Sequence, residues 1–152
     1  MDSVWEKTSN GFGFESLKQD IKTDVLIIGG GMAGILCAYL LEHSGIPYVL
    51  VEAQTIGSGI TKNTTAKITS QHGLIYDKLI REFHVDQARQ YLEANESALA
   101  KYRTLCSEIE CDFEEKTSYV YSLDNRQKIE KEIAALEKLG AHPEFVDRLP
   151  LP

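Results

Sequence analysis

The sequence has few cysteines and no pairing pattern among them. Only three occur in 152 residues, at Cys37, Cys106 and Cys111, and none belongs to a CxxC pair. An odd number of cysteines in a chain of this size does not make a disulfide framework. We therefore expect three free thiols and a reducing compartment, which makes the chain cytoplasmic. Because no histidine lies near Cys106 and Cys111, no metal site is expected.

Long apolar runs and runs of basic residues are absent as well. The first twenty residues mix charged and apolar side chains, so they contain no secretory apolar core. The run Val25–Ile28 is far too short to span a bilayer. The formal net charge is −7, and an acidic chain without basic runs lacks the electrostatic footprint of a nucleic-acid or anionic-membrane binder. These absences leave an ordinary globular protein without nucleic-acid partners or a transmembrane segment.

The sequence does contain a strand–helix–strand pattern near its start. Asp24–Ile28 is an apolar, β-branched run typical of a strand that is buried on both faces. A helical pattern follows over Met32–His43, and Gly45 fits its C-terminal cap. Tyr48–Val51 reads as a second buried strand. This order predicts a parallel βαβ unit.

Glycines occupy the predicted turn between the first strand and the helix. Gly29, Gly31 and Gly34 fit the pattern G-x-G-x-x-G. Gly29 permits the sharp turn, Gly31 lets the backbone approach a pyrophosphate, and Gly34 lets the helix lie close to the strand. The helix N-terminus, at Met32 and Ala33, then faces the phosphates with its N–H groups. The motif predicts a binding site for the ADP half of a dinucleotide.

An acidic residue, Glu52, ends the second strand 18 residues after Gly34. A carboxylate at this point can accept hydrogen bonds from ribose hydroxyls. Its charge would repel the 2′-phosphate of NADP, and no arginine follows closely. FAD and NAD present the same ADP moiety, so the turn and Glu52 fit both. The loop over residues 57–65 favours FAD, because its hydroxyl and amide groups can wrap a pyrophosphate and ribityl chain; the alternative interpretation is a solvent loop.

The rest of the chain is predicted to be mainly helical. Ile75–Phe83 reads as a short helix, and Asp86 is a good N-cap for a longer one. Asn125–Leu139 is a further helix that Gly140 ends. Short strands are expected at Ala66–Ser70, Asp112–Glu115, Tyr119–Tyr121 and Phe145–Val146.

Asp24–Glu52, the Gly57-Ser58-Gly59 turn and Thr61–Gly73 together resemble the start of the D-amino-acid-oxidase-type FAD-dependent oxidoreductases. Within that family they are most similar to the bacterial branch of gamma-glutamylputrescine oxidoreductase-like and Rieske-associated flavoproteins. The resemblance implies a small-molecule substrate, an amine, amino acid or related metabolite with a CH–NH or CH–OH donor. It implies oxidation by hydride transfer to FAD. It also implies an electron-transfer partner or a C-terminal Rieske-type domain in the full-length protein.

The resemblance further implies which loop residues contact FAD. In the family the Gly-Ser loop after the acidic residue touches the FAD phosphates, although Ile60 and Lys62 depart from the family's small-residue pattern in this loop. Some members attach FAD to a histidine in the loop; none lies between Glu52 and Ser70, so noncovalent FAD is expected. The implied contacts add to the glycine turn and Glu52 the residues Ala53, Ser58, Gly59, Thr61, Thr64 and Thr65.

The fold expected from pattern and resemblance is α/β. It consists of a Rossmann-like FAD-binding βαβ unit with an incomplete parallel sheet, followed by a mainly helical α+β part of a substrate domain. The expected divisions are an N-terminal arm over 1–22, the first part of a discontinuous FAD-binding domain over 23–75, and the start of the substrate domain over 76–152. Catalytic residues are expected beyond Pro152, so the chain is expected to be an inactive N-terminal fragment. The alternative is a non-catalytic module that binds NAD.

Overall fold

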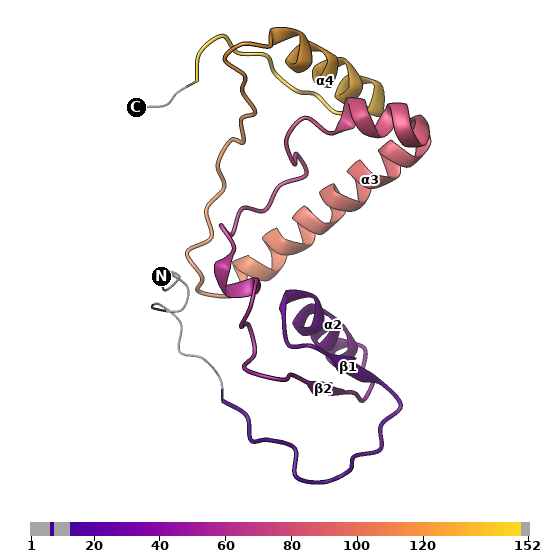
Figure 1. The fold of residues 1–152 in the computed structure, drawn as a ribbon, viewed down its shortest axis with the longest axis vertical. Coiled ribbons are helices and arrows are strands. Elements are labelled where there is room, and N and C mark those ends of the chain that lie inside the picture. The colour runs from indigo at the N-terminus through magenta and orange to yellow at the C-terminus, as the bar shows by residue number, and fades with distance from the viewer. Residues whose placement is uncertain (1–6, 8–12, 150–152) are drawn as a thin grey trace. The chain divides into compact units, whose positions relative to one another are not determined.

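The computed structural model describes residue 7 and residues 13–149 (Figure 1). Half of the expected N-terminal arm, residues 1–6 and 8–12, lies outside the described part. The chain divides into two compact units, Met1–Lys67 and Ile68–Pro152, which are described separately below. In chain order the elements are β1 (Leu26–Ile28), α2 (Met32–His43), β2 (Val49–Val51), the 3-10 turn η1 (Thr61–Asn63), α3 (Tyr76–Ser107) and α4 (Arg126–Leu139).

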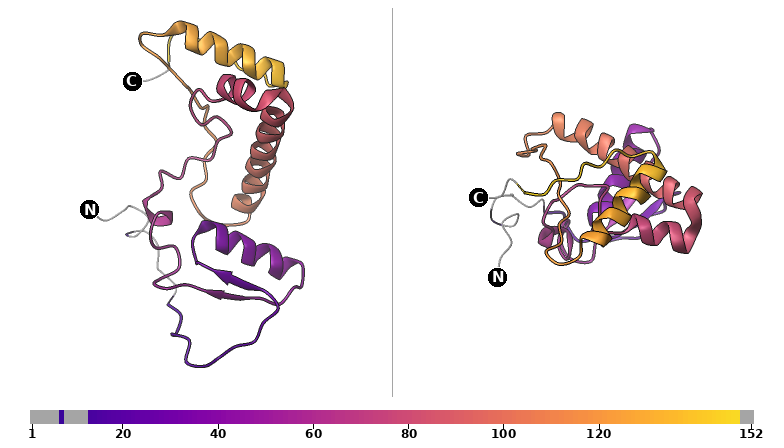
Figure 2. Two further views of the ribbon diagram at one scale, coloured as in Figure 1. Left: turned by 45° about the vertical axis from the view of Figure 1, so that its right-hand side comes forward. Right: turned by 90° about the horizontal axis from the view of Figure 1, so that it is seen from above.

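The first unit contains the βαβ arrangement that the sequence predicts. β1 pairs with β2 in parallel, with Leu26 opposite Val49, and α2 connects them, lying alongside the two strands (Figure 2). The observed helix begins at Met32 and ends at His43, the predicted bounds. Backbone hydrogen bonds continue the pairing beyond the strand ends, since the N–H of Gly29 donates to the oxygen of Val51 at 2.8 Å. The α/β class is therefore confirmed for this unit.

α2 packs against β1 through a point where no side chain fits. A Cβ added at Gly34 would lie 2.0 Å from the carbonyl oxygen of Gly29 and 3.4 Å from Cγ2 of Ile27. Contacts this short to backbone do not occur between real atoms, so only glycine allows the observed approach. The predicted role of Gly34 in close helix–strand packing is confirmed.

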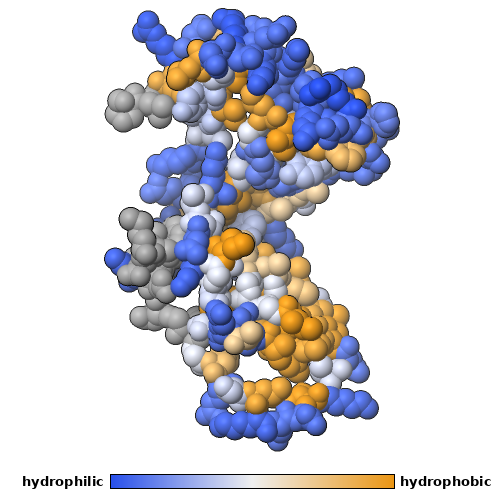
Figure 3. Space-filling model, in the orientation of Figure 1, coloured by the Kyte–Doolittle hydropathy of each residue, from blue (hydrophilic) through white to orange (hydrophobic). Residues whose placement is uncertain are grey.

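The two-stranded sheet is covered on one face only. Ile27 is buried, whereas Leu26 and Ile28 on the other face of β1 are 53% and 82% exposed. Apolar surface is visible over this unit in Figure 3. The prediction that β1 is buried on both faces is wrong for this chain, because α2 covers only the face that carries Ile27.

The second unit is built on α3 and α4. α3 contains one non-helical residue, His84, with φ 64° and ψ 169°, so it consists of the short and the longer helical stretch that the sequence predicts. α4 begins where the Asn125 side chain accepts a hydrogen bond from the N–H of Lys128 at 3.0 Å. It ends at Gly140, whose φ of 92° is left-handed. Both predicted boundaries of this helix are confirmed. The two helices share a buried core of Tyr76, Ala88, Leu92, Ala135 and Leu139.

A buried carboxylate of α4 caps the start of α3. Glu132 accepts hydrogen bonds from the backbone N–H groups of Ile75, Tyr76 and Asp77 at 2.9, 2.9 and 3.0 Å. It also accepts one from the side-chain amide of Gln71 at 2.8 Å. The first N–H groups of a helix have no partner within the helix, and a negative charge is favoured at that end of the helix dipole. Glu132 meets both requirements, and its hydrogen bonds offset the free-energy cost of burying its charge.

Arg89 of α3 makes the reciprocal contact at the end of α4. Its guanidinium donates to the carbonyl oxygens of Leu139 at 2.7 Å and Lys138 at 3.1 Å. The last carbonyls of a helix lack partners within the helix and favour a positive charge. Each helix therefore places a charge on a terminus of the other, and the pair of contacts fixes how α3 and α4 pack.

The strands expected outside the βαβ unit are not formed. Residues 66–70, 112–115, 119–121 and 145–146 all lie in the described part of the chain, and none of them is a strand. A strand requires a neighbouring strand that pairs with its backbone hydrogen-bonding groups. In these segments no such neighbour is present, and side chains such as Tyr121, which is 64% exposed, cover no sheet. The second unit is thus helices joined by extended segments, and the predicted α+β character is wrong for it. None of the helices described here is both long and apolar enough to cross a membrane.

Replacing Gly34 with alanine tests the close approach of α2 to β1. Overpacking costs about 1–3 kcal/mol, and the ~1 kcal/mol that alanine gains in helix propensity offsets only part of a clash with backbone. We expect Gly34→Ala to lower the free energy of unfolding by about 2 kcal/mol, measured by urea denaturation of the intact protein. Gly31→Ala is the matched control, since the added Cβ would meet only Oγ1 of Thr61 at 3.3 Å. Equal stability of the two variants would contradict the packing role.

Replacing Glu132 with glutamine tests the cap on α3. The amide has one acceptor oxygen instead of two and turns an NH₂ group toward backbone donors. Loss of charge-assisted hydrogen bonds in a buried position should lower the unfolding free energy by about 2–4 kcal/mol. Glu137→Gln, on the exposed side of α4, should change it by no more than about 0.5 kcal/mol. A Glu132→Gln protein as stable as the control would show that the cap contributes nothing.

Candidate functional site

The first unit carries the glycine turn that the sequence singles out. Gly29 has φ +106°, a conformation that side chains rarely adopt, so its predicted role in the sharp turn is met. Gly31 is the N-cap of α2, and its carbonyl oxygen accepts the hydrogen bond of Ile35 at 3.0 Å. Within 4 Å of a Cβ built on Gly31 lies only Oγ1 of Thr61. The backbone at Gly31 is therefore open to a close-fitting ligand.

Glu52 ties the end of β2 to this turn. One carboxylate oxygen accepts the N–H of Gly30 at 2.7 Å and the other accepts the N–H of Gln54 at 2.9 Å. These hydrogen bonds, first that of Gly30 and then that of Gln54, hold the pKa of Glu52 below its ordinary value of 4.5. The side chain is thus ionised at neutral pH. The backbone N–H of Ala53 also lowers this pKa. A carboxylate offers about four acceptor positions, so room remains for a hydroxyl donor of a ligand.

The loop after Glu52 returns to the same turn at two points. The N–H of Gly57 donates to the carbonyl oxygen of Gly30 at 2.8 Å. Oγ1 of Thr61, at the start of η1, accepts the N–H of Met32 at 3.2 Å. The loop is shaped by Gly57 and by Gly59, whose φ values of +75° and +72° exclude most side chains. A hydroxyl of the loop therefore lies at the N-terminus of α2.

The predicted residues fall into two groups in the structure. The turn glycines, Glu52, Met32 and Thr61 are brought together by the hydrogen bonds above. The other predicted residues are not joined to the turn by these hydrogen bonds. Four of them are exposed: Ala33 in the first turn of α2, and Ala53, Gly59 and Thr65 in the loop. Ser58 donates its backbone N–H to the oxygen of Thr55, and Oγ1 of Thr64 accepts the N–H of Ala66 at 3.1 Å.

Sequence reasoning missed four residues that hold this arrangement. Gly30 binds both Glu52 and Gly57, and a Cβ on it would lie 3.1 Å from Ile56 and 3.2 Å from Glu52. It stands at a variable position of the motif, although the run of three glycines was a signal for it. Asn63 bonds the carbonyl oxygen of Gly59 at 2.9 Å. Asn63 and Gly57 lie in the loop over 57–65 that the sequence assigns to FAD, but neither is singled out there as a contact, and nothing in the sequence distinguishes Gln54 from an ordinary loop residue.

The arrangement can bind an anion but offers no reacting group of its own. The first turn of α2 contains no acidic residue, so nothing within the turn offsets the positive end of the helix dipole. An open backbone at Gly31, a hydroxyl at Thr61 and an ionised carboxylate at Glu52 fit the pyrophosphate and ribose of an ADP moiety. Within the described residues, no group of three or more His, Cys, Asp or Glu side chains could hold a metal ion.

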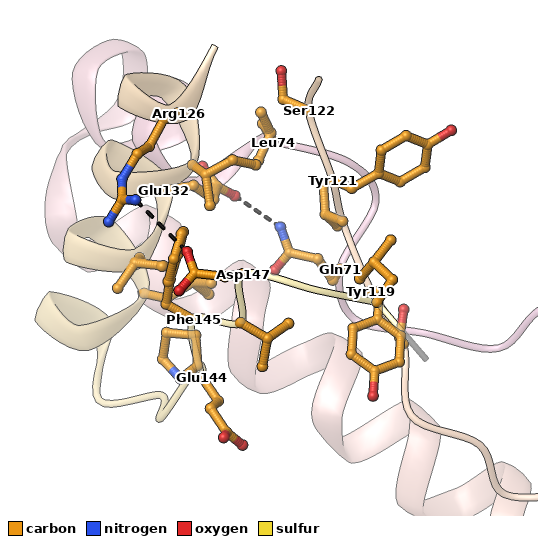
Figure 4. A pocket seen from close by; sticks show the side chains of 18 of the residues that line it. Gln71, Leu74, Tyr119, Tyr121, Ser122, Arg126, Glu132, Glu144, Phe145 and Asp147 are labelled. Atoms are coloured by element: carbon orange, nitrogen blue, oxygen red, sulfur yellow. Dashed lines mark hydrogen bonds and ion pairs between the residues drawn. The ribbon is translucent and has the colours of Figure 1, made fainter. Parts of the chain in front are cut away.

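The second unit has a groove of about 680 Å³ beside α4 (Figure 4). Its lining includes the apolar side chains of Ile129 and Ile133 and the aromatic rings of Tyr119 and Phe145. Its polar groups are already engaged: Gln71 bonds Glu132 at 2.8 Å, and Arg126 lies 3.7 Å from Asp147. Every buried side-chain nitrogen or oxygen in the described part of the chain has a hydrogen-bond partner. The groove therefore presents no unsatisfied polar group that points to a ligand, and the glycine turn is the better candidate.

Comparison with known proteins agrees with the geometry of the turn. The chain is 39% identical, over 99% of its length, to the protein named "Putative Rieske 2Fe-2S iron-sulfur protein YhfW" of Bacillus subtilis. It is 26% identical, over 90% of its length, to gamma-glutamylputrescine oxidoreductase of Escherichia coli. The chain spans 30% and 31% of the length of these relatives. No solved structure matches it.

The family match extends well beyond the glycine turn. The family model described as FAD dependent oxidoreductase (DAO) matches residues 24–150. This range contains the βαβ unit, its loop, and both helices of the second unit. The chain therefore belongs to the DAO family of FAD-dependent oxidoreductases, as its resemblance to that family predicts.

Proposed function

We propose that this chain is the FAD-binding part of an oxidoreductase that oxidises an amine, amino acid or related small metabolite by hydride transfer to noncovalent FAD. The observation that carries the proposal is the glycine turn, open at Gly31 and flanked by ionised Glu52, in a chain of an FAD-dependent family. A donor of the CH–NH or CH–OH type is the expected substrate class. One relative is named for gamma-glutamylputrescine, an amine, which supports the CH–NH type.

The residues of the first unit bind and orient the cofactor in this proposal. Gly31, Met32 and Ala33 at the start of α2 receive the pyrophosphate, while Gly29 and Gly34 shape the turn. Glu52 and Ala53 face the ADP ribose. The contacts on the second face of the pyrophosphate come from Ser58, Gly59, Thr61, Thr64 and Thr65. Bound FAD supplies the acceptor for the hydride.

Glu52 is suited to the ribose by its charge and by its fixed position. Its two backbone hydrogen bonds hold the carboxylate beside the glycine turn, at the end of β2. Ribose hydroxyls then donate to the remaining lone pairs of an ionised acceptor, which makes the stronger kind of hydrogen bond. The same charge disfavours a 2′-phosphate, which would lie next to it.

In this proposal the chain consists of three segments. Residues 1–22 are an arm, 23–75 the first part of a discontinuous FAD-binding domain, and 76–152 the start of the substrate domain, with the catalytic residues elsewhere. Because one relative is named for a Rieske 2Fe-2S centre, an electron-transfer partner or a C-terminal Rieske-type domain is a suitable acceptor of the electrons. The free thiols suit the cytoplasm.

The absorbance spectrum of the purified intact protein tests the proposal. Bound FAD gives visible flavin bands, and anaerobic addition of a substrate amine should bleach them as the flavin is reduced. An NAD-binding module would show neither behaviour. A colourless protein that takes up NAD but not FAD would overturn the proposal.

Substitutions at Gly31 should remove the flavin without unfolding the protein. A valine side chain there would occupy the approach of the pyrophosphate, while the backbone φ of −79° suits any residue. We expect Gly31→Val to weaken FAD binding by roughly tenfold or more, a loss of about 1.4 kcal/mol, measured by flavin content and by titration of the apoprotein. Gly13→Val is the matched control, because a Cβ at Gly13 meets nothing within 4 Å. Full flavin content in Gly31→Val would exclude this turn as the phosphate site.

Glu52→Gln should weaken FAD binding, and its effect on stability should depend on pH. The folded pKa of Glu52 is lowered, so its ionised form stabilises the fold above the ordinary value of 4.5, and this contribution is lost as pH falls through the folded pKa. The stability difference between the parent and Glu52→Gln should therefore shrink between pH 7 and pH 3. Denaturation at several pH values measures it, with exposed Glu42→Gln on α2 as the control. A difference that stays constant with pH would contradict the assigned hydrogen bonds.

A further inference from the structure

Two thiols meet at the C-terminal end of α3. Cys106 lies in the last turn of the helix, which ends at Ser107, and Cys111 lies on the segment that follows it. Both are free, Cys106 being half-buried and Cys111 exposed. Sγ of Cys111 donates a long hydrogen bond, 4.0 Å, to the carbonyl oxygen of Cys106, which places the Cys111 thiol beside the backbone of Cys106. The sequence predicts only that Cys106 and Cys111 do not form a metal site. The contact between Cys111 and Cys106 is a finding of the structure.

The backbone on both sides of the pair is held in place. On the helix side, the N–H of Glu108 donates to the oxygen of Leu105 at 3.2 Å. On the other side, Arg103 forms an ion pair with Glu115, which ties the departing segment back to α3. Between them the chain reverses at Asp112, whose φ is +51°. The Cys111 thiol is therefore held at the end of α3, next to Cys106.

We propose that Cys106 and Cys111 are a redox modification site, at which a low-molecular-weight disulfide converts the two thiols reversibly into one intrachain disulfide. Cys111 is exposed, so its thiolate attacks the small disulfide, forms a mixed disulfide and releases one small thiol. The Cys106 thiolate then attacks Sγ of Cys111, the second small thiol leaves, and the Cys106–Cys111 bond forms. Two protein thiols are oxidised and one small disulfide is reduced to two thiols.

The environment of the two sulfurs supports this order of attack. Burial, the hydrogen bond from Cys111 and the charge of Cys111 raise the pKa of the Cys106 thiol. The thiolate is the nucleophile in disulfide exchange, so Cys106 is the less suited of the two to react first with a reagent in solution. It reacts as the resolving thiol once Cys111 carries the mixed disulfide. Cys37, which is exposed on α2 in the other unit, provides an internal comparison.

Peptide mapping of the intact protein after treatment with oxidised glutathione tests the proposal. Trypsin leaves both cysteines in the single peptide 104–116, which contains no internal lysine or arginine, and Cys37 falls in another peptide. We expect peptide 104–116 to lose the mass of two hydrogen atoms, and dithiothreitol to restore it. Cleavage after Glu108 or Glu110 should leave its two halves joined until reduction. Ellman titration of the treated protein should show two free thiols fewer than in the untreated protein.

Single substitutions separate the two roles. Cys106→Ser should accumulate glutathione on Cys111, because the resolving thiol is gone, whereas Cys111→Ser should leave Cys106 largely unmodified. Cys37→Ser is the matched control and should form the disulfide like the parent. Stable glutathione adducts on Cys111 in the parent, or linkage of either cysteine to Cys37, would overturn the proposal. So would equal glutathione labelling of Cys106 in Cys111→Ser and of Cys111 in Cys106→Ser.

Discussion

The contact of Gly34 with the backbone of Gly29 is the constraint on which the candidate site depends. With no Cβ between them, α2 comes close enough to β1 for its first turn to lie directly beyond the strand end. This position puts the N-terminus of α2 within hydrogen-bonding reach of the Thr61 hydroxyl. It also puts the glycine turn beside Glu52 at the end of β2. A wider helix–strand separation would disperse these groups.

The two units use the ends of their helices in different ways. At the start of α3, the buried carboxylate of Glu132 accepts three backbone N–H groups, so the positive end of that helix is neutralised within the protein. The first turn of α2 contains no acidic residue, and Glu52 is held by the N–H of Gly30, in the turn before the helix. The first arrangement is structural and joins two helices. The second leaves the dipole of α2 available to an anionic ligand.

Several predictions succeeded because they depend on local chemistry. The bounds of α2 and the end of α4 before Gly140 follow from helix periodicity and from a glycine that stops a helix within one turn. The predicted strands near Ala66, Tyr119 and Phe145 failed because a strand exists only with a neighbour, and the described chain has none beside them. The FAD-binding roles of the turn residues, of Glu52 and of the loop residues all stay predictions.

The sequence by itself determined the βαβ unit and the glycine turn, because the residues that produce them lie within one short stretch and act through backbone conformation and spacing. It also determined the DAO family, through a resemblance that extends over most of the chain. Only the tertiary structure decided that Gly30 holds Glu52, that Glu132 caps α3, and that the Cys111 thiol lies against the backbone of Cys106. These contacts depend on where loops and helices return in space. The carboxylate of Glu132 lies 55 to 57 residues after the backbone N–H groups that it accepts, so no local sequence pattern predicts these hydrogen bonds.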